Sequence, residues 1–124
     1  VQAMWETDGE RLPTRLLRPA FLEELAQGLV LARLDLDNNF IGWDRRFVVS
    51  WPGRSHRAVL SAEPPLDFFV LYCPQGCDHF CAEPVSNCSD WLNLAGHPAP
   101  EVGGSVLAPG QALQASWSLR LEPA

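Results

Sequence analysis

The chain has 124 residues, 47% of them hydrophobic, and a formal net charge of −6. This length and composition are typical of one globular domain with its own core. All nine basic residues are arginines, and they are spread along the chain without forming a block. Because nucleic acids and anionic membranes are bound by clustered positive charge, we expect neither as a main partner. The lack of lysine also excludes Schiff-base chemistry.

No stretch of the sequence is long and apolar enough to cross a bilayer, since the longest apolar run, 66–73, is interrupted by Asp67. The first residues also lack the pattern of a secretory signal peptide. We therefore expect a soluble, cytoplasmic protein. The chain opens with Val1 and its only methionine is Met4, so we expect a fragment or a processed chain.

The N-terminal part of the sequence predicts an irregular segment, a short helix and a strand, in that order. Residues 1–18 are polar and contain glycine and proline, which predicts an irregular entry. From Pro19 to Gln27 the apolar residues fall on one face, Pro19 suits the first helical position, and Gly28 can end the helix. Residues 29–36 alternate with a period of two, which predicts a strand.

The rest of the sequence predicts strands separated by turns. Residues 47–51 and 58–60 flank a Pro-Gly pair, which indicates a hairpin. Residues 68–73 are apolar on both faces, as in a core strand that is covered on both sides. Residues 113–121 place apolar side chains on alternate positions, which predicts a last strand with one buried face that includes Trp117. We therefore predict an all-β sandwich with one short helix.

Four cysteines, Cys73, Cys77, Cys81 and Cys88, lie close together with His79 among them. Their spacing lacks the paired C-x2-C motifs that are typical of a structural zinc site. We interpret them as small buried hydrophobic residues and expect neither a metal nor a cofactor. A metal-binding or redox module built on these cysteines is the less favoured alternative.

Glu83 is a carboxylate within the otherwise apolar run Phe80–Ser86 and directly precedes Pro84. The proline biases Glu83 toward extended backbone, so we expect the carboxylate at the end of a strand. A carboxylate in apolar surroundings is suited to act as a general base. The competing interpretation is a side chain that points into water, as most glutamates do.

Three blocks of this sequence resemble the aldose 1-epimerase family and follow its order. Phe80–Ser86, followed by Asp90 and Asn93, resembles the family signature, in which a Glu-Pro pair precedes a small hydroxyl residue and later an Asp and an Asn. Upstream, Leu36–Trp43 resembles the family's Asp-x-x-Phe segment. Downstream, Val106–Gln111 resembles its turn into the last strand.

The resemblance extends over about residues 10–122 and implies both a fold and a reaction. It implies that residues 1–124 form a single domain, the C-terminal part of a galactose-mutarotase-like β-supersandwich. In the family, a glutamate takes the proton of the anomeric hydroxyl while a histidine protonates the ring oxygen, and the ring opens and recloses. The resemblance therefore implies a mutarotase that interconverts the α and β anomers of a hexose, without metal or organic cofactor.

The resemblance also implies roles for individual residues. Glu83 matches the catalytic base, and Asp37 matches the aspartate that accepts hydrogen bonds from sugar hydroxyls. Because sugar sites often offer an aromatic face to the ring, we expect Trp43 to bind substrate, with Phe40 and Trp91 as further candidates.

The family's acid histidines lie upstream of the region that resembles this chain. His56, His79 and His97 match none of them, so the identity of the general acid stays open. We expect the missing N-terminal half of the same fold, or a self-association that replaces it, to complete the protein and to cover an exposed sheet edge. The alternative function is a non-catalytic carbohydrate-binding β-sandwich.

Overall fold

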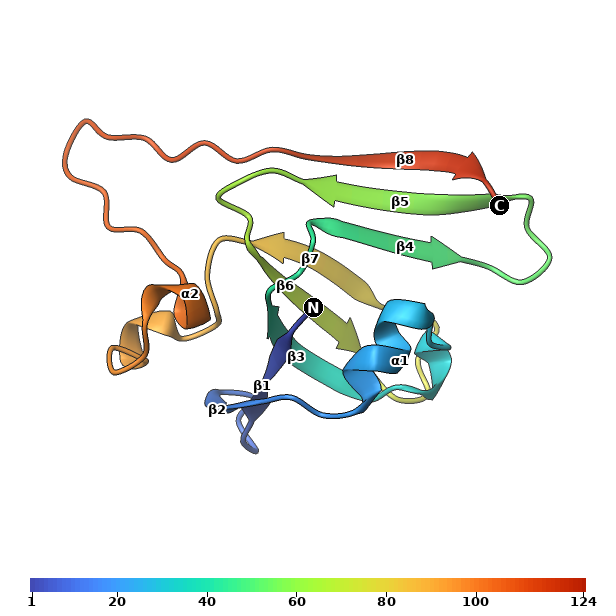
Figure 1. Cartoon of the computed structure of the whole chain (residues 1–124), viewed down its shortest axis with the longest axis horizontal. Coiled ribbons are helices and arrows are strands. Elements are labelled where there is room, and N and C mark those ends of the chain that lie inside the picture. Colours follow the sequence, from blue (N-terminus) through green and yellow to red (C-terminus); the bar gives the residue numbers. More distant parts are fainter.

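The computed structural model describes all residues from 1 to 124 as two packed antiparallel β-sheets (Figure 1). One sheet has the strand order β2-β1-β3-β6-β7, and the other has the order β4-β5-β8. The strands are β1 (Ala3–Thr7), β2 (Pro13–Leu17), β3 (Leu36–Ile41), β4 (Arg46–Ser50), β5 (His56–Ala62), β6 (Phe68–Cys73), β7 (Cys81–Val85) and β8 (Trp117–Pro123). The predicted all-β sandwich is confirmed.

The helical elements are short and lie at opposite ends of the molecule (Figure 1). They are α1 (Phe21–Gln27), α2 (Ala99–Val102) and two 3-10 turns, η1 (Leu31–Arg33) and η2 (Trp91–Asn93). The predicted helix is confirmed as α1, although it begins at Phe21 and not at Pro19. Gly28 follows it with a φ of 114°, a conformation that favours glycine. None of these helices has the length and apolar character needed to span a membrane.

The main core lies between the two sheets, under α1. It combines Phe40, Phe69 and Leu71 from the five-stranded sheet with Leu60 and Ala62 from the three-stranded sheet and Leu22 from α1, among others. The predicted central strand is β6, which lies between β3 and β7, but its predicted cover on both faces is incomplete, since Val70 and Tyr72 on its outer face line an open pocket. The predicted hairpin is confirmed as β4 and β5.

A second core covers part of the outer face of the five-stranded sheet, on the side away from the three-stranded sheet. Its buried members are Ala3, Trp5, Ile41, Phe68, Cys88 and Val102. The last two come from the connection between β7 and β8, which therefore packs back onto the outer face. Only part of that face is covered, and the uncovered part carries the candidate site.

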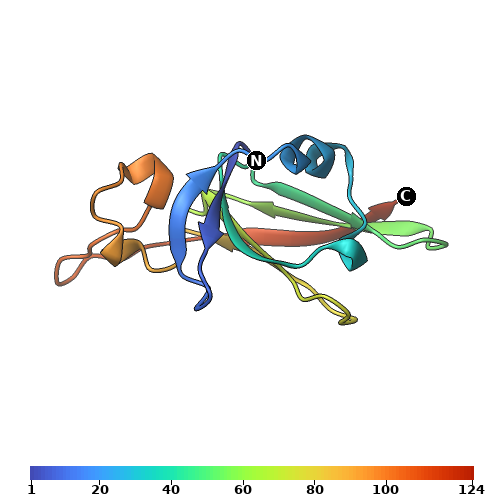
Figure 2. The ribbon, with the colours of Figure 1, turned by 90° about the horizontal axis from the view of Figure 1, so that it is seen from below.

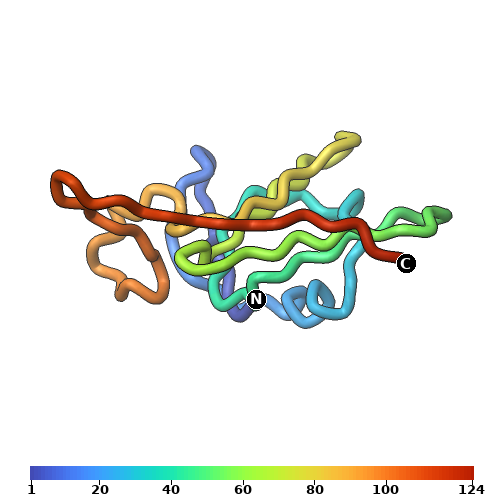
Figure 3. The backbone as a smooth tube through the Cα atoms, turned by 90° about the horizontal axis from the view of Figure 1, so that it is seen from above, coloured from blue at the N-terminus to red at the C-terminus, as the bar shows by residue number.

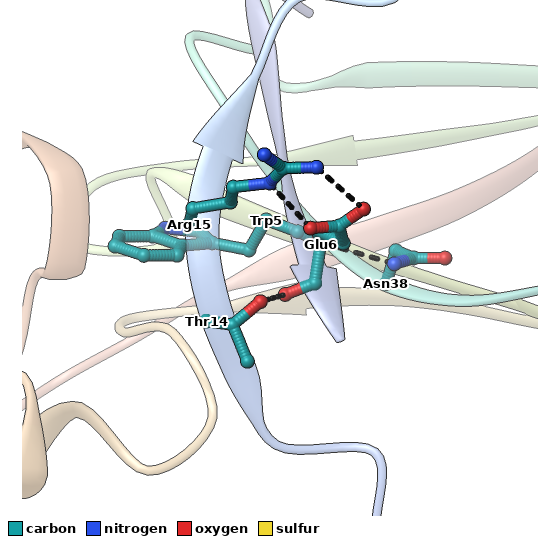
Figure 4. A network of polar contacts seen from close by, with 5 residues as sticks. All are labelled: Trp5, Glu6, Thr14, Arg15 and Asn38. Carbon is teal, nitrogen blue, oxygen red and sulfur yellow. Dashed lines mark hydrogen bonds and ion pairs between the residues drawn. The ribbon is translucent and has the colours of Figure 1, made fainter. Parts of the chain in front are cut away.

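The prediction of an irregular segment over residues 1–18 was wrong, because these residues form the β1–β2 hairpin. Asp8 shapes its turn by accepting hydrogen bonds from the backbone N–H groups of Glu10 and Leu12, at 2.9 and 3.0 Å. The polar residues that suggested a loop lie on the exposed side, where Arg15 pairs with Glu6 at 2.5 Å (Figure 4). This ion pair lowers the pKa of the Glu6 carboxyl.

Asn38 joins this hairpin to the rest of the five-stranded sheet. Its buried side-chain amide donates a hydrogen bond of 2.9 Å to the backbone carbonyl of Trp5 (Figure 4). Seen from below, β1 and β2 cross the direction of the three-stranded sheet (Figure 2). Residues at the start of the chain are thereby placed beside β3, which carries part of the site.

The predicted strand over residues 29–36 was also wrong. Residues 31–33 form the 3-10 turn η1, and the strand begins only at Leu36. Leu31 and Leu34, which are three positions apart, pack against the main core, whereas Val30 and Ala32 are exposed. Burial in this segment therefore does not follow the period of two that suggested a strand.

The last strand is present as β8, but it begins at Trp117 and not at Leu113, and its predicted buried face is exposed. β8 pairs with β5 through Leu60 and Leu119 and through Ala58 and Leu121, so its apolar residues lie on the same face as the core residues of β5. Figure 3 shows the C-terminal stretch running in an extended path along the molecule. Because nothing packs over this edge, Trp117 is 63% exposed. We call Leu113, Trp117, Leu119 and Leu121 the apolar row.

Candidate functional site

Four polar side chains come together on the outer face of the five-stranded sheet. Asp37 on β3 is paired with Tyr72 on β6, and Asn39 on β3 is paired with Val70 on β6. Val70 is paired in turn with Glu83 on β7. Directly paired residues of a sheet share a face, so Asp37, Asn39, Tyr72 and Glu83 project from the same side. Val70 lies between Asn39 and Glu83.

These residues line an open pocket with a volume of about 730 Å³, which is within the usual range for small-molecule sites. Its other lining residues are Leu66, Val70, Val85, Ser86, Asn87 and Ser89. The pocket therefore has an apolar floor around Val70 and polar groups at its rim, two of which are carboxylates. No arginine or histidine is among the lining residues.

The two carboxylates that the sequence singled out, Asp37 and Glu83, line the same pocket. They lie 46 positions apart in the sequence, and β6 between their strands brings them together. Asp37 is half-buried, and its backbone N–H donates a hydrogen bond of 3.2 Å to the side-chain oxygen of Asn38.

Glu83 is exposed, although its sequence neighbours are apolar. The reason is topological, since β7 is the edge strand of its sheet and no further strand shields it. An edge strand also tolerates Pro84, which has no N–H to donate. The apolar surroundings expected for Glu83 are thus absent. Its expected extended backbone is confirmed, but Glu83 is the middle residue of β7 and does not lie at the end of a strand.

Trp43 lies in the main core and not in the pocket, so its expected contact with substrate is not supported. It is 8% exposed, its ring stacks on Phe69 at a centroid distance of 4.7 Å, and its indole N–H donates to the carbonyl of Leu66 at 3.2 Å. Phe40 is fully buried in the same core. Trp91 packs against the second core.

Several pocket residues were missed at the level of sequence: Asn39, Tyr72, Ser86, Asn87 and Ser89. Tyr72 had a local signal, because it is the polar-tipped aromatic of an apolar strand and lies at an alternate position to Val70. Asn39 follows Asp37 by two positions, so it shares its face. The other three follow Glu83 closely, but only the path of the chain after β7 brings them over the pocket.

The three histidines lie outside the pocket lining. His97 contacts Glu101 at 3.1 Å and meets the ring of Trp5 edge-on. His56 contacts Ser55 at 3.0 Å, and His79 lies 3.6 Å from Asp78. The general acid of the expected reaction is therefore not supplied by a histidine of this pocket.

The four cysteines are free thiols in different surroundings. Cys73 is buried in the main core and Cys88 in the second core, as expected for small hydrophobic residues, whereas Cys77 is exposed and Cys81 is half-buried. Burial, with a smaller contribution from Asp90, raises the pKa of the Cys88 thiol to about 12. No group of three or more histidine, cysteine, aspartate or glutamate side chains is arranged to hold a metal ion.

The fold and site together define an all-β sandwich with a carboxylate-lined pocket on the outer face of one sheet. No family model matches the chain. The chain is 28% identical over 116 residues to the uncharacterized protein YphB of Escherichia coli (strain K12), a match that covers 82% of this chain and 38% of that protein. The chain thus spans well under half the length of this curated relative.

Proposed function

We propose that this chain carries the base-bearing part of an aldose 1-epimerase-like enzyme with a galactose-mutarotase-like fold. The observation that carries the proposal is the shared pocket of Asp37 and Glu83, the two carboxylates that the family resemblance singles out. A pocket with an apolar floor and a polar rim suits a sugar, which presents C–H groups on its ring faces and hydroxyls around its edge.

In the proposed reaction, Glu83 acts as general base on the anomeric hydroxyl. The proton of that hydroxyl moves to the Glu83 carboxylate, the electrons of the O–H bond form the C1 carbonyl, and the bond from C1 to the ring oxygen breaks. A general acid protonates the ring oxygen. Rotation about the C1–C2 bond and reversal of these steps give the other anomer. Asp37 holds the sugar by accepting hydrogen bonds from its hydroxyls.

A non-catalytic sugar-binding sandwich is the second candidate. The observation that favours it is the pocket lining, which includes no histidine. Asp37, Tyr72 and Glu83 would then serve only to bind hydroxyls and the ring face. The two candidates share the ligand class and differ in whether bound anomers interconvert.

NMR spectroscopy tests both candidates in two steps. We expect D-galactose or D-glucose, added to the ¹⁵N-labelled chain, to shift the amide signals of β3, β6 and β7 around the pocket and to leave those of the β4–β5 turn unchanged. In a form of the protein that also carries the general acid, saturation transfer between the α and β anomeric protons of the same sugar then reports interconversion. Binding with transfer supports the enzyme, binding without transfer supports the second candidate, and no binding of either sugar contradicts both.

The proposal includes a partner for the part of the apolar row that lies on β8, namely further β-structure of the same fold. β8 ends the order β4-β5-β8 and leaves one edge of its backbone unpaired, which is a template for another strand. Its exposed residues Leu119 and Leu121 lie on the same face of the sheet as the core residues of β5. The matched region is 38% of the relative's length, and we propose that further residues of this kind form the strands that cover the row.

Light scattering tests this partner. We expect the isolated chain to be a monomer, because the strands that cover the row are not part of it. A dimer that Leu121→Arg dissociates would assign the row to a second copy of the chain instead. Leu92→Arg, the same substitution at an exposed site in η2, is the control for added charge.

A further inference from the structure

Asn39 and Ser89 form a two-point contact at the pocket. Asn39 lies on β3 and is 4% exposed, whereas Ser89 is exposed and lies in the connection after β7. The Asn39 side-chain N–H donates to the Ser89 hydroxyl oxygen at 3.1 Å. The backbone N–H of Ser89 donates to the Asn39 side-chain oxygen at 3.2 Å. One buried amide therefore holds both the backbone and the side chain of Ser89.

The chemistry of the two groups fixes the orientation of this contact. A backbone N–H can only donate, so the Asn39 oxygen must face it. The Asn39 nitrogen must then face the Ser89 hydroxyl oxygen, which accepts. A serine hydroxyl that accepts one hydrogen bond still has its own proton to donate. Because Ser89 is exposed and lines the pocket, that proton is available to a ligand.

The chain around Ser89 has other anchors. Cys88 is buried in the second core, and its N–H donates to the carbonyl of Val102 at 2.8 Å. Asn87 is paired with Gly103, where a Cβ would lie 2.4 Å from the Phe68 ring. These anchors place the segment over the sheet independently of Asn39. Besides holding the backbone N–H of Ser89, Asn39 thus determines the direction of the Ser89 hydroxyl.

We propose that Asn39 is a positioning residue of the pocket, which directs the Ser89 hydroxyl proton toward an oxygen of the bound sugar. The proposal rests on the proposed function and adds a hydrogen-bond donor to the two carboxylate acceptors of the pocket. The Asp37 and Glu83 carboxylates can only accept hydrogen bonds when ionised, whereas sugar oxygens also need donors. Ser89 supplies a donor on the side of the pocket where the connection crosses the sheet.

The test is a double-mutant cycle on the dissociation constant for D-galactose and D-glucose, measured by NMR titration. Ser89→Ala removes the donor at an exposed site and is expected to weaken binding about two- to tenfold, the usual range for one neutral hydrogen bond. Ser89→Thr keeps the hydroxyl and should restore binding. Asn39→Asp keeps the size of the side chain but only accepts, so the Ser89 hydroxyl turns its proton toward the new carboxylate and binding weakens equally.

The double variant separates positioning from a merely structural role. If Asn39 acts through the Ser89 hydroxyl, Asn39→Asp causes no further loss in the Ser89→Ala background. Additive losses, or unchanged affinity in Ser89→Ala, would overturn the inference while leaving sugar binding by the wild type intact. Wild-type protein that binds neither sugar would overturn the proposed function as well. Since Ser89 is exposed, its two variants should fold, and unchanged affinity in Ser89→Ala overturns the inference even where Asn39→Asp folds poorly.

Discussion

Replacing Glu83 with glutamine is expected to lower the rate of anomer interconversion by about a hundredfold or more, the usual contribution of a general acid–base group. Glutamine has almost the same shape as glutamate and still forms hydrogen bonds, but it cannot take the anomeric proton at neutral pH. The Glu83 side chain is exposed and makes no salt bridge, so the fold and melting temperature should not change. A lower rate would therefore reflect the loss of proton transfer and not a loss of folded protein.

Polarimetry of freshly dissolved α-D-glucose or α-D-galactose measures this rate above the spontaneous background. The comparison requires a form of the protein that carries the general acid, and we expect the isolated chain to be slow. Glu10→Gln is the matched control, because it makes the same chemical change at an exposed site in the β1–β2 turn, outside the pocket. An unchanged rate in Glu83→Gln would remove Glu83 from the role of base.

The same experiment with Asp37→Asn addresses the other carboxylate of the pocket. Because Asp37 is expected to bind sugar hydroxyls without exchanging a proton with them, its loss should raise KM more than it lowers kcat. An equal fall in kcat for both variants would mean that the two carboxylates act on the proton together.

Truncation of Trp5 to alanine is expected to lower the free energy of unfolding by about 3–5 kcal/mol, as for other large aromatic residues in a core. Trp5 is fully buried in the second core, and its indole N–H donates to the carbonyl of Glu101 at 2.9 Å. The substitution removes this packing and leaves that carbonyl without its partner. Domains of this size have total stabilities of only about 5–15 kcal/mol, so the loss is a large part of the whole.

Trp117→Ala is the matched control, because it is the same substitution on the exposed apolar row. Surface substitutions usually change stability by about 0.5 kcal/mol or less, and Trp117 is exposed in this chain. Urea unfolding followed by circular dichroism measures both variants, and Trp5→Phe, which keeps a ring, should recover much of the loss. Similar losses in the two alanine variants would show that the apolar row is covered in solution.

The sequence by itself determined the elements whose signals are local. The helix α1 follows from Pro19, its apolar face and Gly28, and the β4–β5 hairpin follows from strand residues on both sides of a Pro-Gly pair. The two carboxylates of the pocket were also found from sequence, because Glu83 precedes a proline within an apolar run and Asp37 belongs to a second block of the same resemblance.

The tertiary structure alone decided which faces are buried and which residues share the pocket. Alternation shows that Trp117 and Leu121 lie on one face, but whether that face is covered depends on what lies opposite it. An aromatic residue near a motif, such as Trp43, can lie in the core or in the site, and only the stacking on Phe69 settles this. The Asn39–Ser89 contact joins residues 50 positions apart, and it forms only because the chain after β7 folds back over the sheet.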